Sequence, residues 1–459
     1  MKVLLPFLLA SGLTAQQPAP ADHQLAHDLL KELIEINTTD SSGDNTRAAE
    51  AVAARFRAAG FPSSDIQLLT PAERKGNLIV RYRGAGTAKP ILFLGHLDVV
   101  EARRSDWTLD PFVLTEKDGY YYGRGTQDMK GDDALIVAAF LTLKRRGFQP
   151  AGDLILALTS DEEGGDHNGV QWLVANHRDL IDAAFCINAD SGGGHIRDGK
   201  RVLYAVEGAE KVFNSFRFTT SNRGGHSSIP RKDNAIYELS EGLTRLAGYQ
   251  FPVHLNPVTQ GYFERMSVVE TGQLADDFRA VSKSAPNLAA TSRLSENPYY
   301  NALLRTTCVA TELSGGHAEN ALPQRAQAIV NCRVLPNESQ ADTFAKLKEI
   351  AGPAVSVEPL RPEKPRVDVA LSPGVLKIIK TTVDSMWPNL PLVPVMDTGA
   401  SDGIFLEAAG MPVYGLSAMF GDENDVRAHG QDERIRVDWF NDGLDFELRL
   451  IQSLAESHE

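Results

Sequence analysis

The sequence predicts an α/β protein that carries a smaller inserted α+β domain, and two observations support this prediction. Nearly all-apolar strand-like runs alternate with helical stretches before about residue 208 and again after about residue 366. Between these parts, strand-like runs alternate apolar and polar residues, as half-exposed strands do. We therefore divide the chain into a signal peptide and linker (1–21), a main domain in two parts (22–207 and 361–459) and an inserted domain (208–360).

The first part of the main domain begins with helical spacing of apolar residues over residues 22–60, interrupted by a polar loop. Four strand-like runs follow: NLIVRYRG, KPILFLGHLDVV, DLILALTS and AFCINAD. Helical stretches lie between them, namely DALIVAAFLTLKRRG and NGVQWLVANHRDLI. Because the strand runs are almost entirely apolar, we expect a sheet that is covered by helices on both faces.

The inserted domain has its own order of elements. KVFNSFRFTTSN and AQAIVNCRVLP are predicted strands, and NAIYELSEGLTRLAGY and SQADTFAKLKEIAG are predicted helices. Residues 250–305 have a less regular pattern of helices and loops that the sequence does not place. The α/β pattern then returns with PGVLKIIKTTVDSMW, MPVYGLSA and a final amphipathic helix, DWFNDGLDFELRLIQSLAE.

The N-terminus indicates export. One lysine, a short apolar run and small residues are typical of a secretory signal peptide, with candidate cleavage sites after Ala15 and Ala21. The alternative is an uncleaved anchor, but the run is shorter than the ~20 residues that a span needs. No other segment is apolar enough to cross a bilayer. We expect a periplasmic or secreted protein.

Composition excludes some classes of function. The net charge of -14 argues against a nucleic-acid surface, which requires a basic face. The three cysteines, Cys186, Cys308 and Cys332, are too few and too scattered for a disulfide scaffold or a cysteine-rich metal site. We expect them to be small buried side chains.

Metal-binding residue types follow the apolar strands. They end three of the strand runs, precede one helix and recur near the C-terminus: His96, Asp98, Asp128, Glu162, Glu163, Asp190 and His429. Taken singly, each has an ordinary explanation as a turn, a surface residue or a solvated acid. Because strand ends of an open α/β sheet meet at one edge, where sites form, their coincidence indicates a single site.

A metal site explains why adjacent acids are tolerated beside a core. Divalent cations convert the repulsion between clustered carboxylates into coordination. Histidines and carboxylates without thiolates suit zinc, with manganese or cobalt as alternatives. Two histidines and three acids are too many for one tetrahedral ion with an open position, so we expect two ions that share a carboxylate and a water.

Seven motifs together resemble those of one enzyme family. In chain order they are GHLDVV, GRGTQDMKG, TSDEEGG, INADSGG, RGGHSSIP, NALPQRA and HGQDERI. Their order and content resemble the aminoacylase-1, vacuolar carboxypeptidase S and succinyl-diaminopimelate desuccinylase family, over nearly the whole mature chain. The resemblance implies a zinc-exopeptidase-like mixed sheet flanked by helices, with the inserted domain as a lid.

The resemblance also implies roles for the residues at the strand ends. Asp128 would bridge two metal ions, His96 and Asp190 would complete one shell, and Glu163 and His429 the other. Asp98 would hold the His96 imidazole. Glu162 would be the general base, and it would pass the proton of the attacking water to the leaving amine. The peptide bond between Asp128 and Met129 would be cis.

The lid and the last loop would contribute substrate contacts. By resemblance, His226 would stabilise the oxyanion, often from a partner subunit, so a homodimer through the lid is expected. Asn320 and Arg333 would hold the substrate, with Arg333 suited to a carboxylate. Backbone and hydroxyl donors would come from Gly399, Ala400 and Ser401. An insertion at residues 250–305 that supplies the missing wall within one chain is the alternative to pairing.

The function expected from this combination is hydrolysis of an amide bond beside a free carboxylate by two divalent ions, most suitably zinc. The substrates would be peptides, cleaved as by a carboxypeptidase or dipeptidase, or alternatively N-acyl amino acids. A non-enzymatic metal or peptide binder is the rival class, which a missing Glu162 or metal ligand would favour, but none is missing. A two-metal phosphoesterase lacks support because the sequence has no phosphate-binding glycine loop or arginine cluster.

Overall fold

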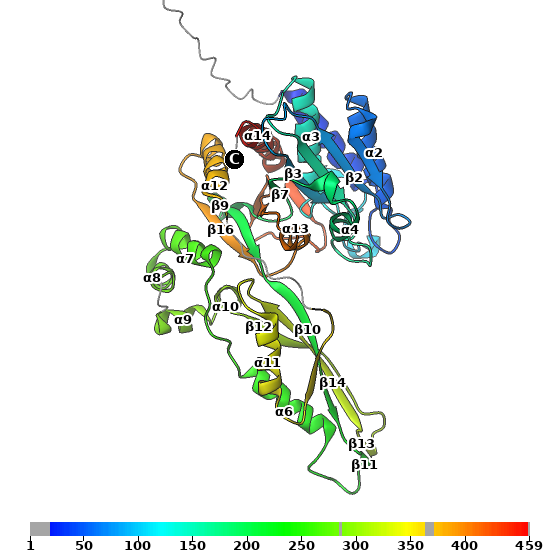
Figure 1. Ribbon diagram of the computed structural model, residues 1–459, viewed down its shortest axis with the longest axis vertical. Coiled ribbons are helices and arrows are strands. Elements are labelled where there is room, and N and C mark those ends of the chain that lie inside the picture. Colours follow the sequence, from blue (N-terminus) through cyan, green and yellow to red (C-terminus); the bar gives the residue numbers. More distant parts are fainter. Residues whose placement is uncertain (1–18, 284–286, 363–370, 458–459) are drawn as a thin grey trace, which may run out of the picture.

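The computed structural model describes residues 19–283, 287–362 and 371–457. A large mixed sheet with its helices forms one end of the molecule, and an elongated lid extends from it (Figure 1). Within the described ranges, no helix has the length and apolar character needed to cross a membrane. Residues 1–18, which include the predicted apolar signal run and the candidate cleavage site after Ala15, lie outside the described ranges.

The large sheet has ten strands and both parallel and antiparallel pairs. Its order is β1-β2-β6-β3-β7-β17-β9-β8-β18, with β16 also paired to β9. The bounds are β1 Ile66–Leu69, β2 Asn77–Tyr82, β3 Ile91–His96, β6 Leu154–Thr159, β7 Phe185–Asn188, β8 Gly193–Arg197, β9 Lys200–Glu210, β16 Leu392–Asp397, β17 Val413–Gly415 and β18 Phe420–Asp422. The central strands β6, β3, β7 and β17 are parallel, so their carboxyl ends meet at one edge.

Helices cover both faces of this sheet, as predicted. One face packs against α1 (Pro20–Ile34), α2 (Asn45–Ala58), α3 (Lys130–Arg145), α12 (Pro373–Met386) and α14 (Val437–Ala455). The other packs against α4 (Gly169–Asn176), α5 (Arg178–Ile181) and α13 (Gly403–Ala408). Successive strand residues alternate between these two cores: Phe93 belongs to the first core, and Leu92 and Leu94 belong to the second.

Helix α1 begins inside the segment that the sequence assigns to the linker. Pro20 occupies its first turn, and the Asp22 carboxylate accepts a hydrogen bond from the Ala19 amide at 2.8 Å. Asp22 is buried and also pairs with Arg146 at 2.7 Å. The folded part therefore starts before residue 22.

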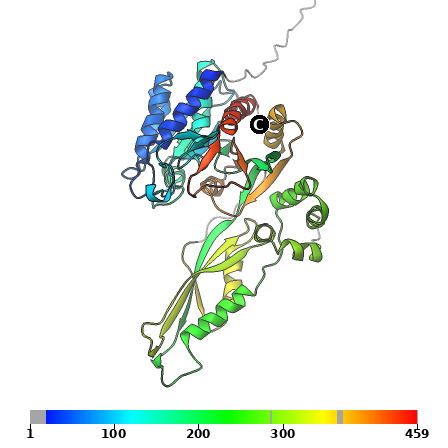
Figure 2. The same ribbon diagram turned by 180° about the vertical axis from the view of Figure 1, so that it is seen from behind.

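The lid contains a four-stranded antiparallel sheet in the order β12-β14-β10-β15. Its strands are β10 Val212–Ser221, β12 Thr307–Gly315, β14 Arg325–Val334 and β15 Ser356–Pro359, and helices α6 (Ala235–Ala247) and α11 (Gln340–Ala351) pack on one face. A short pair, β11 (Gly225–His226) and β13 (Ala321–Leu322), lies at the tip far from the large sheet (Figures 1 and 2). Only Lys211 separates the end of β9 from the start of β10.

The described residues of 250–305, a range that the sequence left unplaced, contain four helices. These are α7 (Pro257–Val269), α8 (Gly272–Val281), α9 (Leu288–Leu294) and α10 (Pro298–Leu304). We call them the helical insert. Their apolar faces form a separate core with residues of β9 and β16, so the insert packs on the large sheet beside the base of the lid (Figure 1). A fourth, three-stranded sheet consists of β4 (Thr115–Lys117), β5 (Tyr120–Tyr122) and β19 (Arg434–Arg436).

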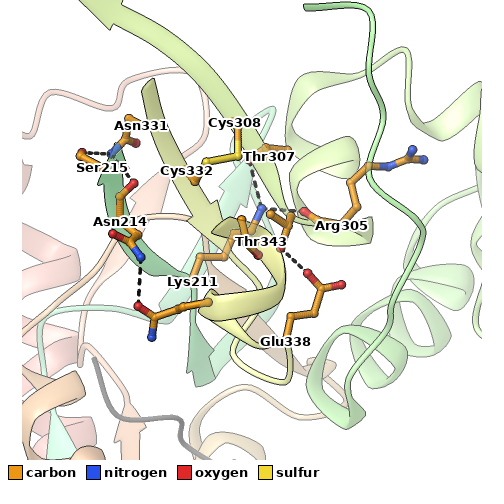
Figure 3. The surroundings of a disulfide bond; sticks show 12 residues. Lys211, Asn214, Ser215, Arg305, Thr307, Cys308, Asn331, Cys332, Glu338 and Thr343 are labelled. Atoms are coloured by element: carbon orange, nitrogen blue, oxygen red, sulfur yellow. Dashed lines mark hydrogen bonds between the residues drawn. A yellow bond between two sulfur atoms is a disulfide. The ribbon is translucent and has the colours of Figure 1, made fainter. Parts of the chain in front are cut away.

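The expectation for the cysteines is wrong for two of the three. Cys308 and Cys332 form a disulfide within the lid (Figure 3), whereas Cys186 is free and buried. The two half-cystines lie directly opposite each other on β12 and β14. Their 24-residue separation gave no hint of this pairing, because it depends on the register between strands that are connected through a turn at the lid tip.

Candidate active site

Five of the predicted residues come together at the carboxyl edge of the central strands. His96 ends β3, Glu163 follows β6, Asp190 follows β7, and Asp128 directly precedes the first turn of α3. His429 joins them from the loop between β18 and β19. Residues far apart in the sequence therefore meet because parallel strands end on the same side of the sheet.

The five side chains form two groups that share Asp128. His96 Nε2 lies 3.1 Å from Asp128 Oδ1 and 3.4 Å from Asp190 Oδ1. His429 Nε2 lies 3.0 Å from Asp128 Oδ2 and 2.9 Å from Glu163 Oε1. In each group, one ligand-type atom per residue lies within 4.8 Å of the others, a spacing that could hold a metal ion. The two oxygens of Asp128 thus face different groups, as a bridging carboxylate requires.

The electrostatics of the site fit a cation. Burial, together with the nearby Asp190 carboxylate, raises the pKa of Glu162 to about 10. Burial and the charge of Asp128 raise the pKa of Glu163 to about 7. Such crowding disfavours ionised acids in the protein alone, and a divalent ion beside them reverses this preference. The donor set of two imidazoles and three carboxylates suits zinc, cobalt or manganese.

Glu162 stands apart from both groups. Its carboxylate is partly buried, and no hydrogen bond to it is found within the described part of the chain. The neighbouring Glu163 carboxylate instead contacts His429 at 2.9 Å. Adjacent glutamates therefore have different surroundings, one among the candidate ligands and one outside both groups.

The peptide bond between Asp128 and Met129 is cis, which confirms that prediction.

Sequence comparison decides the family. The model of peptidase family M20/M25/M40 matches residues 92–453, which include every candidate ligand. The chain belongs to this family. It is therefore a metallohydrolase, and a dinuclear metal site is the arrangement that the family uses.

Named relatives and solved structures cover almost the whole chain. Human N-fatty-acyl-amino acid synthase/hydrolase PM20D1 is 28% identical over 457 residues, covering 94% of this chain and 88% of the relative. Human aminoacylase-1 is 26% identical over 381 residues, covering 80% and 81%. A metallo-carboxypeptidase of this family from Sulfolobus solfataricus has the same fold, with a TM-score of 0.66, 16% identity, and 94% and 99% coverage. The mixed sheet with a separate lid is thus the fold of M20 enzymes.

Asp98 acts on the candidate ligands in two ways. Its backbone carbonyl lies 3.0 Å from His96 Nδ1, closer than its own carboxylate, which lies 3.7 Å away. The carboxylate instead accepts hydrogen bonds from the backbone amides of Glu162 and Glu163 at 3.2 and 2.9 Å. Asp98 was expected to hold the imidazole through its side chain; here the main chain has the shorter contact, and the side chain holds the loop with the two glutamates.

A buried ion pair that the sequence did not single out connects two of the ligand loops. Arg124 and Glu433 lie 2.6 Å apart and are almost fully buried. Glu433 accepts hydrogen bonds from the amides of Gln127 and Asp128 at 2.7 and 3.1 Å. Arg124 donates to the carbonyl of Gly430, the residue after His429, at 2.9 Å. Both residues lie inside quoted motifs, but their pairing depends on tertiary contact.

Breaking this pair is expected to weaken metal binding in the Asp128, Glu163 and His429 group most. Arg124→Met removes the contacts that hold the Gly430 carbonyl and Glu433, so the affinity of one of two metal ions should fall by about 10- to 100-fold. Equilibrium dialysis of the chelated protein measures this.

The control is Asp22→Asn, which disturbs the buried pair of Asp22 with Arg146 far from the ligands. It should lower thermal stability without changing metal affinity. Equal loss of metal in both variants would show a general folding effect.

The predicted substrate loop, Gly399 to Ser401, is hydrogen-bonded to a buried acid, Glu210. The Glu210 carboxylate accepts hydrogen bonds from the Ser401 amide at 2.8 Å and from the Ser401 hydroxyl. Gly399 donates its amide to Asp397 at 2.8 Å, and Ala400 is exposed. Because the donors of Ser401 and Gly399 are already engaged, the loop offers fewer free donors to a substrate than the sequence suggested.

Arg333 lies at the base of the lid near that loop. It is half-buried on β14, and its guanidinium stacks on Phe213 at 4.8 Å. Burial lowers its pKa, while the charge of Asp397 at the end of β16 opposes that shift. The Arg333 guanidinium is therefore close enough to Asp397 for the charge of that carboxylate to influence its pKa.

His226 and Asn320 are not brought to the metal ligands. Both lie at the exposed tip of the lid, where β11 and β13 pair and the Ser227 amide donates to the Asn320 carbonyl at 3.0 Å. His226 Nδ1 accepts a hydrogen bond from the Ser228 amide at 3.2 Å. The tip is remote from the carboxyl edge of the large sheet (Figure 1).

Proposed function

We propose that this M20 enzyme hydrolyses the amide bond of N-acyl amino acids that carry a free carboxylate, with two zinc ions as the metal. The two ligand groups that share Asp128 carry the proposal, because this geometry matches a hydrolytic two-metal site. Similarity to PM20D1, whose name states N-fatty-acyl amino acids, favours acyl substrates. Peptides, cleaved as by a carboxypeptidase, are the second candidate.

The residues would divide the chemistry as follows. The bound ions would polarise the scissile carbonyl and lower the pKa of a water. Glu162 would accept the proton of the attacking water and deliver it to the leaving nitrogen, which requires a carboxylate that is not a metal ligand. Asp98 would keep Glu162 and Glu163 in place through their amides. Arg333 would bind the substrate carboxylate through its planar guanidinium.

A cavity of about 310 Å³ beside the ligands would receive the acyl group. Asp128 and Asp190 line it, and much of its remaining wall is apolar, including Met419, Phe420 and Val426. Its buried acid Asp132 is engaged by the Ala418 amide at 2.9 Å. The exposed acid Glu423 also lines the cavity and pairs with Arg197 at 2.7 Å. Asp422 also lines the cavity, so the preference for an uncharged acyl chain over the ammonium group of a free peptide rests on the apolar part of the wall.

Acyl-chain length tests this substrate assignment. For N-acyl phenylalanines from acetyl to dodecanoyl, kcat/KM should rise up to about fourfold per added methylene until the cavity is full, since burying a methylene contributes about 0.8 kcal/mol. The matching amides, which lack the free carboxylate, should be poor substrates. Free dipeptides that outperform every N-acyl amino acid would instead support the peptidase.

Export is also part of the proposal. The disulfide between Cys308 and Cys332 supports an oxidising compartment, because disulfides are rare in the cytosol. Cleavage after Ala15 would leave α1 intact, whereas cleavage after Ala21 would remove its first two residues. The first site is therefore favoured.

A further inference from the structure

A second cavity, of about 530 Å³, lies where the helical insert meets the base of the lid. It is lined by the segment at residues 250–253, by α9 and by Arg305, which follows α10. None of its lining residues lines the cavity beside the metal ligands. Nothing in the proposed hydrolysis uses this cavity.

Arg305 is a buried cation without a counterion. Arg305 is only 6% exposed. In the described ranges, no carboxylate oxygen lies closer than 4.0 Å to its guanidinium nitrogens. Its terminal nitrogens donate to the Phe251 carbonyl at 3.0 Å, to Gln250 Oε1 at 3.3 Å and to Ser295 Oγ at 2.9 Å, all of them uncharged acceptors. Its Nε is buried and has no hydrogen-bond partner in the described part of the chain. Burying an unpaired charge is costly, so such groups usually have an ionic partner.

Arg124, the other deeply buried arginine of the described residues, has the carboxylate partner that Arg305 lacks. Arg124, at 2% exposure, has Glu433 at 2.6 Å. Glu296 lines the same cavity as Arg305 but is exposed, and no ion pair joins the two. Burial alone lowers the pKa of Arg305. The Arg305 site therefore has room beside it and a cation to offer.

The walls define the ligand that would fit. Hydroxyls of Thr291 and Ser292 accompany the single guanidinium, which matches one carboxylate. Glu296 at the cavity disfavours a multiply charged anion such as phosphate. Phe251 is buried, and Leu288 lies on the wall at 86% exposure, so both offer apolar surface to a ligand.

We propose that this cavity binds an amphipathic monocarboxylate, with its head group on Arg305 and its apolar tail along Phe251 and Leu288. The site lies at the joint between sheet and lid. The Arg305 carbonyl accepts a hydrogen bond from Lys211 Nζ at 2.8 Å, and Lys211 connects β9 to β10. Figure 3 shows the Arg305 side chain turned away from Lys211 and from the disulfide. The inference does not depend on the proposed function.

Binding is measured by calorimetry on full-length Glu162→Gln protein, so that no amide substrate is consumed. The probes are decanoate, N-decanoylglycine, 1-decanol and inorganic phosphate. We expect at least one of the two carboxylates to occupy a site that neither decanol nor phosphate fills. Which of them binds identifies the source of the ligand, a free fatty acid or an N-acyl amino acid.

Substitutions locate the site. Arg305→Met should weaken carboxylate binding at this one site by about tenfold or more, the range for losing a hydrogen bond to a charged group. Ser292→Glu adds a repelling charge on an exposed residue, so it tests the same head group without touching the core. Leu288→Ser should weaken binding of the ten-carbon chain. Val268→Ser, at another exposed apolar residue, on α7, should not.

Unchanged stoichiometry and affinity in both Arg305→Met and Ser292→Glu would overturn the proposal. So would equal binding of 1-decanol. If the proposed function is wrong, the wild-type protein will not hydrolyse the N-acyl amino acids. That result would leave these binding measurements unaffected.

Discussion

Glu162→Gln is expected to keep both metal ions and to lose turnover by about 10²-fold or more, the scale of a missing general base. The glutamine has nearly the same shape but cannot accept the proton of the attacking water. Glu162 belongs to neither ligand group, so its replacement leaves all five candidate ligands unchanged. Metal analysis and a hydrolysis assay on the same preparation measure both properties.

Asp128→Ala is the matched variant, because Asp128 is the member common to both groups. It should lose metal as well as activity, whereas Glu162→Gln should lose activity alone. Near-normal hydrolysis by Glu162→Gln would show that Glu162 is not the general base. Loss of metal in Glu162→Gln would instead make it a ligand.

His226→Ala is expected to keep the fold and both metals while losing about 10²-fold or more in turnover, the magnitude of one oxyanion donor. His226 is exposed at the lid tip and hydrogen-bonded only locally, so its removal should not disturb the core. In this structure the tip is remote from the ligands (Figure 2), so a contribution to catalysis requires lid movement or a second subunit. We propose the second, a homodimer that pairs through the lids.

Mixed dimers distinguish these routes. Combining His226→Ala with Glu162→Gln should restore activity, because a hybrid then has one intact sheet site and one intact lid tip that face each other. Subunit exchange is verified with differently tagged chains. Exchange without recovery would place His226 on its own chain's site, and the helical insert at the base of the lid would then be the remaining candidate for a wall.

The metal ligands could be predicted because their chemistry is local to the ends of strands. His96, Glu163 and Asp190 each close an apolar run, and parallel strands bring such ends together whatever the details of packing. Asp128, before a helix, and His429, near the C-terminus, were candidates by residue type, and the motif resemblance supplied their roles. The large sheet was predictable for the same reason, as its buried strands read as continuous apolar runs.

The features that the sequence analysis did not predict depend on contacts between segments that are distant in the sequence. Glu433 and Glu210 look like ordinary acids, and their function as acceptors for Asp128 and Ser401 amides appears only when distant loops meet. The Cys308–Cys332 bond likewise follows from strand register. The helical insert was unreadable because its four short helices bury apolar residues against β9 and β16, not against one another alone.

The most direct test of the central claim is hydrolysis of N-decanoyl-phenylalanine by the purified protein, followed by release of both decanoate and phenylalanine. We expect equal release of the two products, loss of activity after removal of metal with a chelator, and recovery when two equivalents of zinc are restored. Full activity in the metal-free protein, or no hydrolysis of any N-acyl amino acid or peptide by the zinc-loaded protein, would contradict it.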